Sequence, residues 1–259
     1  MGTTRHQQAV CLLMTLAAGC STVVERPVVE MTRSAPAIIE AQPASSPPAA
    51  STPSKDLAES MRSDLIDQAR AWLGQGLRAF DVQGERYSAD CSGFVQAVYA
   101  GNGLPFRERL VGLPASEGGA TASIYRLIQG SGELYHDPRL VLPGDLIFWD
   151  DTYDRNRNGR LDDPLTHVAI AERVDADGTV HYLHRGSRGV TVGYLNLTRP
   201  EQYRDETGKP VNSGIRQRRS GDPPGTRYLA SQLFVAFGRF DPELWATGEP
   251  SGNENTVRP

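Results

Sequence analysis

The spacing of apolar residues changes near Pro143, and this change limits the folds available to the chain. Before it, apolar side chains recur every three or four residues, which is typical of amphipathic helices. After it, short apolar runs alternate with turns, which is typical of strands. The predicted helices are 56–74, 90–101 and 121–129, and the predicted strands are 145–149, 166–174, 179–185, 189–197 and 228–240. Helices followed by meandering strands favour an α+β fold in which N-terminal helices pack on an antiparallel β-sheet.

Residues 1–19 have the pattern of a secretory signal peptide. A basic start at Arg5 precedes an apolar run, residues 9–18, that is too short to cross a bilayer about 30 Å thick. The run ends in Ala18-Gly19-Cys20, which resembles a bacterial lipobox. Cys20 is therefore expected to carry lipid and to become the new N-terminus, which would anchor the protein to a membrane. An ordinary signal cleaved elsewhere and a buried apolar strand are the alternatives.

The lipobox resemblance also implies a location. Ser21, rather than Asp, follows Cys20, and in lipoproteins this favours sorting to the outer membrane. We therefore expect a protein that is lipid-anchored in the cell envelope, on the periplasmic face of the outer membrane.

Composition divides the rest of the chain. Residues 20–55 are rich in Pro, Ala, Ser and Thr, and such a segment is predicted to form an extended tether because it cannot bury a core. Residues 56–245 are predicted to form one folded domain, and residues 246–259 a disordered tail. The formal net charge of −4 gives no reason to expect nucleic acid as a partner. We expect a monomer.

The stretch "DCSGFV" contains the candidate nucleophile, Cys91. Of the three cysteines, Cys11 lies in the signal and Cys20 at the lipobox, so Cys91 is the one thiol of the mature protein. It stands at a helix start with Asp90 as N-cap, where the partial positive charge favours a thiolate and free N–H groups can receive an oxyanion. A small buried core cysteine is the alternative, but the neighbouring Asp, Ser and Gly fit it poorly.

A cysteine nucleophile needs a base, and His167 is the best candidate because it opens a strand directly after a turn. The base needs a group that orients its other ring nitrogen. His184 lies at the end of a strand, on the same face as Val180 and Tyr182, and is the favoured orienting residue. His181, on the opposite face, is the second choice.

Together, "DCSGFV", "PGDLIFW", "HVAIAE" and "YLHRGSRGVTV" resemble the NlpC/P60 family of cell-wall peptidases, in order and in spacing. The resemblance implies a papain-like fold and a triad of Cys91 as nucleophile, His167 as base and His184 as third polar residue. It implies a D,L-endopeptidase that cuts stem peptides of peptidoglycan, its partner, with no cofactor required. A CHAP-like N-acetylmuramoyl-L-alanine amidase and a catalytically silent wall-binding lipoprotein are the alternatives.

The chain also departs from the family pattern. Many members place a Tyr about a dozen residues before the cysteine, where this chain has Phe80, with Tyr87 closer in. Tyr87 and Ser92 are the substrate-binding candidates. The insertion around Asp154 and the long loop after Thr198 exceed the minimal family domain, so substrate preference is expected to differ.

The insertion "DRNRNGRLDD" matches the start of an EF-hand-type calcium loop. The candidate ligands are Asp154, Asn156, Asn158 and Asp162. Position 12 is Leu165 rather than the usual Glu, with Asp163 or Asp151 as a substitute. Two of the ligands are Asn and three Arg residues lie in the loop, so any structural Ca²⁺ is expected to bind weakly. The alternative is a polar hairpin tip with Asn158-Gly159 in a type I′ turn.

Overall fold

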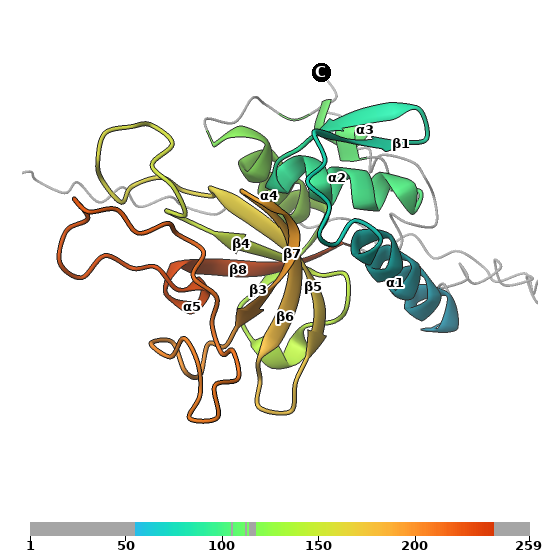
Figure 1. Cartoon of the computed structure of the whole chain (residues 1–259). Helices are drawn as coiled ribbons and strands as arrows, with labels where there is room; N and C mark the ends of the chain where they lie inside the picture. Colours follow the sequence, from blue (N-terminus) through green and yellow to red (C-terminus); the bar gives the residue numbers. More distant parts are fainter. Residues whose placement is uncertain (1–54, 105, 112, 114–117, 241–259) are drawn as a thin grey trace, which may run out of the picture. The chain divides into compact units, whose positions relative to one another are not determined.

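Figure 1 shows the computed structural model of the chain. The structure describes residues 55–104, 106–111, 113 and 118–240. The predictions of a signal peptide, of lipid on Cys20, of the tether and of the tail therefore fall outside the described residues, apart from the last tether residue. Within the described part, no helix has both the length and the apolar character that a membrane span requires.

Three helices form where the apolar spacing predicts them. They are α1 (Lys55–Arg70), α2 (Cys91–Gly101) and α4 (Gly119–Ser131). Two elements are additions to the prediction, the short helix α3 (Phe106–Val111) and the 3₁₀ turn η1 (Pro138–Leu140). The strand predicted over 228–240 is wrong in its first part, because residues 230–233 form the short helix α5 (Ala230–Leu233) and the strand begins only at Phe234. Elements this short contain too few repeats of the apolar spacing to stand out in a sequence.

The described strands form an antiparallel sheet of six strands in the order β3-β8-β4-β5-β6-β7. Their bounds are β3 (Gly132–Tyr135), β4 (Leu146–Trp149), β5 (His167–Val174), β6 (Val180–Gly186), β7 (Gly189–Leu195) and β8 (Phe234–Phe240). Strands β4 to β7 follow one another as a meander, and β8 returns to pair with the other edge of β4. The predicted α+β class with an antiparallel sheet is confirmed.

A small hairpin precedes α2 and was not predicted. Strand β1 (Ala79–Val82) pairs antiparallel with β2 (Glu85–Ser88). Gln83 and Gly84 form the turn with φ angles of 51° and 83°, and two consecutive left-handed residues are typical of a type I′ turn. Gln is an uncommon choice at the first position, which hides the turn from pattern reading. The hairpin delivers the chain directly to Cys91.

The sheet is buried on both faces, because successive side chains of a strand point to opposite sides. On one face Phe148 packs in a cluster with Phe94 of α2 and Ile124 of α4, and Figure 1 shows these helices grouped beside the sheet. On the other face Trp149 and Tyr182 lie in a second cluster and are fully buried. Burying one large apolar side chain contributes about 1.5–3 kcal/mol, so both clusters stabilise the strands that carry the site.

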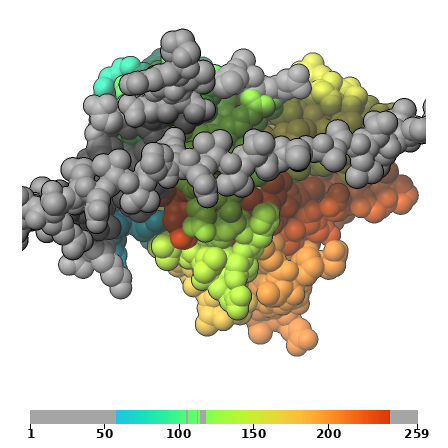
Figure 2. All heavy atoms as spheres, turned by 180° about the vertical axis from the view of Figure 1, so that it is seen from behind, coloured from blue at the N-terminus to red at the C-terminus, as the bar shows by residue number. Residues whose placement is uncertain are grey.

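The polar segment 198–229 covers part of the second face. Ile215 of this segment packs against the second cluster. The side chain of Asn212 donates hydrogen bonds to the carbonyl oxygens of Arg199 and Gln202, at 2.8 and 3.0 Å, which holds the segment without regular structure. In Figures 1 and 2 this segment (orange to red) and the loop 150–166 (yellow-green to yellow) stand out on the same side.

Candidate active site

Cys91 is the first residue of α2, and local chemistry fixes this helix start. The Asp90 carboxylate accepts hydrogen bonds from the backbone N–H of Gly93 at 2.8 Å and from the Ser92 hydroxyl at 2.7 Å. A cap of this kind is worth about 1 kcal/mol. A Cβ on Gly93 would lie 2.0 Å from the carbonyl oxygen of Ser88, so only glycine lets β2 pass this close to the helix.

His167 and His184 come from neighbouring strands and contact each other. His167 opens β5, His184 lies near the end of β6, and His167 Nε2 is 2.8 Å from His184 Nδ1. Buried aromatic rings flank the pair, with Trp149 centred 5.8 Å from His167 and Tyr182 centred 5.2 Å from His184. Because Nε2 of His167 is engaged, Nδ1 is its remaining nitrogen for proton transfer.

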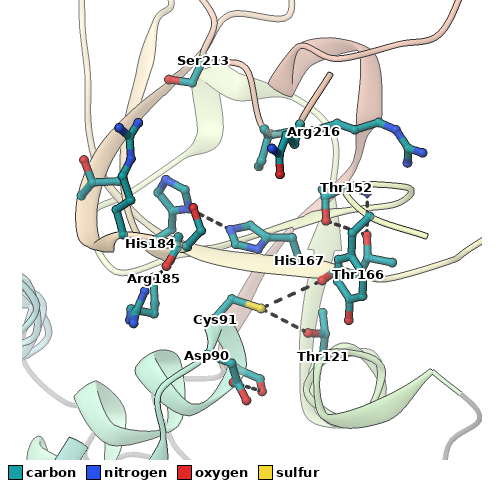
Figure 3. Close-up of a pocket in the computed structure, with 18 of the residues that line it drawn as sticks. Asp90, Cys91, Thr121, Thr152, Thr166, His167, His184, Arg185, Ser213 and Arg216 are labelled. Atoms are coloured by element: carbon teal, nitrogen blue, oxygen red, sulfur yellow. Dashed lines mark hydrogen bonds between the residues drawn. The ribbon is translucent and has the colours of Figure 1, made fainter. Parts of the chain in front are cut away.

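The thiol and the histidine pair share one cavity of about 1350 Å³. Figure 3 shows the Cys91 sulfur below the imidazole of His167, with His184 to the left of His167 and joined to it by a dashed line. The sulfur lies 3.9 Å from the Thr121 hydroxyl of α4 and 4.0 Å from the carbonyl oxygen of Thr166. The structure therefore brings together the three residues that the sequence nominated as a triad, from α2, β5 and β6.

Burial dominates the protonation of the site. It raises the pKa of the Cys91 thiol, and the hydrogen bond from the backbone N–H of Val168 offsets only part of this rise. Burial also holds the pKa of His167 well below its usual range, with a further contribution from His184. Burial lowers the pKa of His184 to about 4. At neutral pH the thiol and both imidazoles are uncharged, although the helix start alone predicted a thiolate.

The other sequence candidates fall in different places. Ser92 lines the cavity, but it is buried and its hydroxyl is bound to Asp90. Tyr87 does not reach the cavity, because its ring is buried in the core with the guanidinium of Arg107 stacked 4.7 Å from its centre. Phe80 is likewise a core residue. No substrate contact is therefore available to Tyr87 in this fold.

His181, the second choice for the orienting residue, lies away from the pair. Its Nε2 is 3.0 Å from Asp175 and its Nδ1 is 3.0 Å from Arg173, both near the far end of β5. Lys209 joins the same carboxylate at 2.9 Å. These contacts belong to a charged network that ties the β5–β6 hairpin to the 198–229 segment.

The candidate calcium ligands gather in the loop 150–166 and accept hydrogen bonds from backbone or side-chain amide N–H groups of the same loop. Asp154 accepts from the N–H groups of Asn158 at 3.1 Å and Gly159 at 3.0 Å. Asp162 accepts from the side-chain amides of Asn156 and Asn158. No group of three or more His, Cys, Asp or Glu suited to a metal occurs among the described residues, and this count leaves the two Asn out.

The structure differs from the sequence predictions for this loop in two respects, the substitute for the twelfth calcium ligand and the position of the turn. The proposed substitutes for the twelfth ligand are already engaged, because Asp163 accepts from the N–H groups of Arg155 and Asn156 and Asp151 accepts from the N–H of Asp163. The predicted type I′ turn at Asn158-Gly159 is wrong, since Asn158 is not left-handed and the left-handed residues are Arg157 and Gly159.

Several cavity residues had no signal in the sequence. Thr152, Tyr153 and Arg155 line it from the loop 150–166, and residues 213–217 line it from the 198–229 segment. Arg216 donates a hydrogen bond to the carbonyl oxygen of Asp151, which joins the two insertions directly. The one hint in the sequence was that both segments exceed the minimal domain of the family that the sequence resembles.

Comparison with known protein families finds no family that matches this chain, and no curated protein matches it.

Proposed function

We propose that this protein is a papain-like cysteine peptidase of the NlpC/P60 type that cleaves an amide bond in peptidoglycan stem peptides. The observation that carries the proposal is the convergence of Cys91 with the His167–His184 pair on one open cavity. A nucleophile at a helix start, a base within the same cavity and a partner on the second base nitrogen are the parts that thiol-based acyl transfer needs. The same residues carry the family resemblance.

Attack begins with both the Cys91 thiol and the His167 imidazole uncharged. His167 donates its Nε2–H to His184 Nδ1, so Nδ1 of His167 is unprotonated and accepts the thiol proton as the sulfur approaches the carbonyl carbon. The Cys91 sulfur–carbon bond forms and the carbonyl π electrons move to oxygen. Free N–H groups at the start of α2 stabilise this oxygen. His184 holds the imidazole of His167 in the required tautomer and stabilises its charge.

The intermediate then collapses to a thioester. The carbon–nitrogen bond breaks, and the leaving nitrogen takes the proton from His167 Nδ1. A water molecule, deprotonated by the same nitrogen, attacks the thioester carbon and releases the acid and the Cys91 thiol. Each proton removed by His167 is returned within the same cycle, so no cofactor is required.

The charge and size of the cavity support an acidic peptide as substrate. Its charged lining residues are Asp90, Arg155, Arg185, Arg188 and Arg216, so arginines outnumber carboxylates, whereas the whole chain carries a net charge of −4. Stem peptides carry free carboxylates that such a lining attracts. The volume of about 1350 Å³ exceeds that of typical small-molecule sites, which suits a branched peptide.

The anchor completes the proposal. Lipid on Cys20 and the Pro-rich tether of residues 20–55 would hold the domain at the periplasmic face of the outer membrane, within reach of the wall. The protein would act there as a monomer on peptidoglycan.

The test is digestion of purified peptidoglycan by the full-length protein in detergent, with the new chain ends identified by mass spectrometry. We expect stem peptides cut between amino acids. The variants Cys91→Ala and His167→Ala should each lower the rate at least about 10³-fold, since nucleophile and base act as a unit. His136→Ala is the matched control, because His136 is exposed and lies outside the cavity.

Each outcome has a distinct meaning. Release of whole stem peptides from the sugar would show an N-acetylmuramoyl-L-alanine amidase instead. Wall binding without new chain ends would show a silent binding protein. Digestion by Cys91→Ala at the wild-type rate would remove the thiol mechanism altogether.

A further inference from the structure

The loop 150–166 forms a wall of the cavity beside the nucleophile. It supplies Thr152, Tyr153 and Arg155 to the lining, and its last residue, Thr166, places a carbonyl oxygen 4.0 Å from the Cys91 sulfur. The loop connects β4 to β5, and these strands are paired up to Trp149 and His167. The position of the loop is therefore set by β5, the same strand that positions His167.

Hydrogen bonds hold together the two ends of the loop 150–166, where it leaves β4 and enters β5. Thr152 N–H donates to the Thr166 hydroxyl at 2.9 Å, and the two hydroxyls are also 2.9 Å apart. The N–H of Asp151 donates to the carbonyl oxygen of Asp163 at 2.9 Å, and the N–H of Leu165 donates to the Asp150 carboxylate at 2.7 Å. These bonds fix the backbone on either side of Tyr153 and the strand that follows.

Two residues near the ends of this loop adopt a backbone conformation that residues with side chains disfavour. Asp151 has φ of 53° and Leu165 has φ of 51°, both in the left-handed region, and Leu has no side-chain hydrogen bond to offset this strain. Strain of this kind persists where surrounding contacts impose it, and it concentrates at functional sites. Asp151 lies two residues before Tyr153, which is on the cavity wall, and Leu165 lies two residues before His167.

Tyr153 is the lining residue of this loop with an available hydroxyl. Its side chain is 49% exposed, and within the described residues its hydroxyl makes no hydrogen bond. The other polar groups of the loop lining are engaged: Thr152 with Thr166, and Arg155 with the carbonyl oxygens of Gly118 and Pro164. A free donor is therefore held at the wall of a reactive cavity.

The protonation state of Tyr153 follows from its surroundings. Burial is the main cause that raises the pKa of Tyr153, and a negative charge developing on Cys91 would raise it further. At neutral pH the phenol is therefore protonated and able to donate a hydrogen bond.

We propose that the Tyr153 hydroxyl donates a hydrogen bond to the carbonyl oxygen of the substrate while Cys91 attacks, which makes Tyr153 a catalytic residue. The inference rests on the proposed function. When the sulfur–carbon bond forms, the carbonyl π electrons move to oxygen, and the phenol stabilises that charge without giving up its proton. When the intermediate collapses, the electrons return, the carbon–nitrogen bond breaks and the hydrogen bond weakens. Tyr153 thus adds a side-chain donor to the N–H groups of α2.

The test compares two reactions of the same thiol in the full-length protein. p-Nitrophenyl acetate acylates Cys91 through an intermediate that carries an oxyanion, and released p-nitrophenolate reports the rate. Iodoacetamide alkylates Cys91 by displacement at a saturated carbon, which creates no oxyanion there. We expect Tyr153→Phe to slow acylation by on the order of 10- to 100-fold and to leave the alkylation rate within about twofold of wild type.

Tyr203→Phe is the matched control. Tyr203 lines the same cavity from the 198–229 segment and is 54% exposed, so it is a second half-exposed tyrosine of the lining that a different segment carries. Its variant should leave both rates unchanged.

Three outcomes would overturn the inference. Equal acylation by Tyr153→Phe and wild type would show that the hydroxyl takes no part. An equal slowing of acylation and alkylation would mean that Tyr153 acts on the thiol itself. Failure of the wild-type protein to acylate above the Cys91→Ala background would overturn the proposed function, and this inference with it.

Discussion

At the residue scale, two opposing influences act on the Cys91 thiol. The helix start and the N–H of Val168 favour the thiolate, whereas burial and the Asp90 carboxylate favour the thiol, and burial is the largest of these. His167 is kept neutral by burial as well. The thiol and the imidazole therefore rest uncharged, so in the proposed mechanism their ion pair forms only during attack. This differs from an enzyme whose thiolate is formed in advance by a charged histidine.

The neutral pair leads to a pH prediction. The pKa of a thiol in the folded site is raised above the ordinary value of 9.0, so the thiolate fraction is small at neutral pH and grows with pH. The rate of Cys91 alkylation by iodoacetamide should then rise steadily from pH 6 to beyond pH 9. A rate that reaches its plateau between about pH 5 and 7 would show a preformed thiolate–imidazolium pair instead. Cys91→Ala provides the background.

At the element scale, the loop 150–166 has two parts with different chemistry. Its base is held by Asp151 and Asp163, which bind backbone N–H groups and are buried. Its tip carries Asp154, Asn156, Asn158 and Asp162, which are more exposed and bind one another's amides. A calcium ion at the tip would replace those weak internal hydrogen bonds, while the base would keep its form without the ion.

Calcium binding at the tip predicts a gain in stability. An ion bound only by the folded protein should stabilise it by on the order of 1–3 kcal/mol at saturation. The melting temperature should be higher in millimolar Ca²⁺ than in chelator, with no such gain from Mg²⁺, which fits flexible oxygen loops poorly. Asp154→Ala should abolish the difference.

The matched control for the calcium test is Asp205→Ala. Asp205 accepts hydrogen bonds from the backbone N–H groups of Thr207 and Lys209, both at 2.9 Å, as Asp154 does in its own loop. Its replacement should lower the melting temperature equally with and without calcium. Identical melting curves of the wild-type protein in Ca²⁺ and chelator would leave the tip as a polar turn.

At the scale of the whole molecule, the central sheet and the two long loop segments have different structural roles. The sheet and α2 position the reacting groups, and the loop 150–166 and the 198–229 segment build the walls around them. Arg216 joins the two insertions through the carbonyl oxygen of Asp151. Under the proposed function, changes in these two wall segments would alter the substrate preference without moving the strands that carry the two histidines.

The anchor gives a prediction for the whole protein. If Cys20 carries lipid, Cys20→Ala should move the protein from the membrane fraction to the soluble fraction, because the acyl chains supply the membrane affinity. Cys11→Ala is the matched control, since this cysteine lies within the predicted signal peptide and should leave the distribution unchanged. Mass spectrometry of the native N-terminus checks the result directly, and an unmodified terminus away from Cys20 would contradict it.

The amino-acid sequence alone determined what depends on near neighbours along the chain. Asp90 caps α2 at Cys91, as predicted, because a cap acts on N–H groups only two or three residues away. The alternation of side chains along β6 placed Tyr182 and His184 on one face, and the structure finds His184, not His181, beside His167. The α+β class followed from the change in apolar spacing in the same way.

Tertiary structure alone decided what depends on residues distant in the sequence. Tyr87 lies in the core, and Tyr153 lies on the cavity wall. Strand pairing and the hydrogen bonds that hold the loop 150–166 set these surroundings, and neither can be read from a local sequence pattern. The protonation of Cys91 followed the same rule. A helix start is visible in a sequence, but the desolvation that outweighs it comes from elements brought together only by folding, β5 and α4 among them.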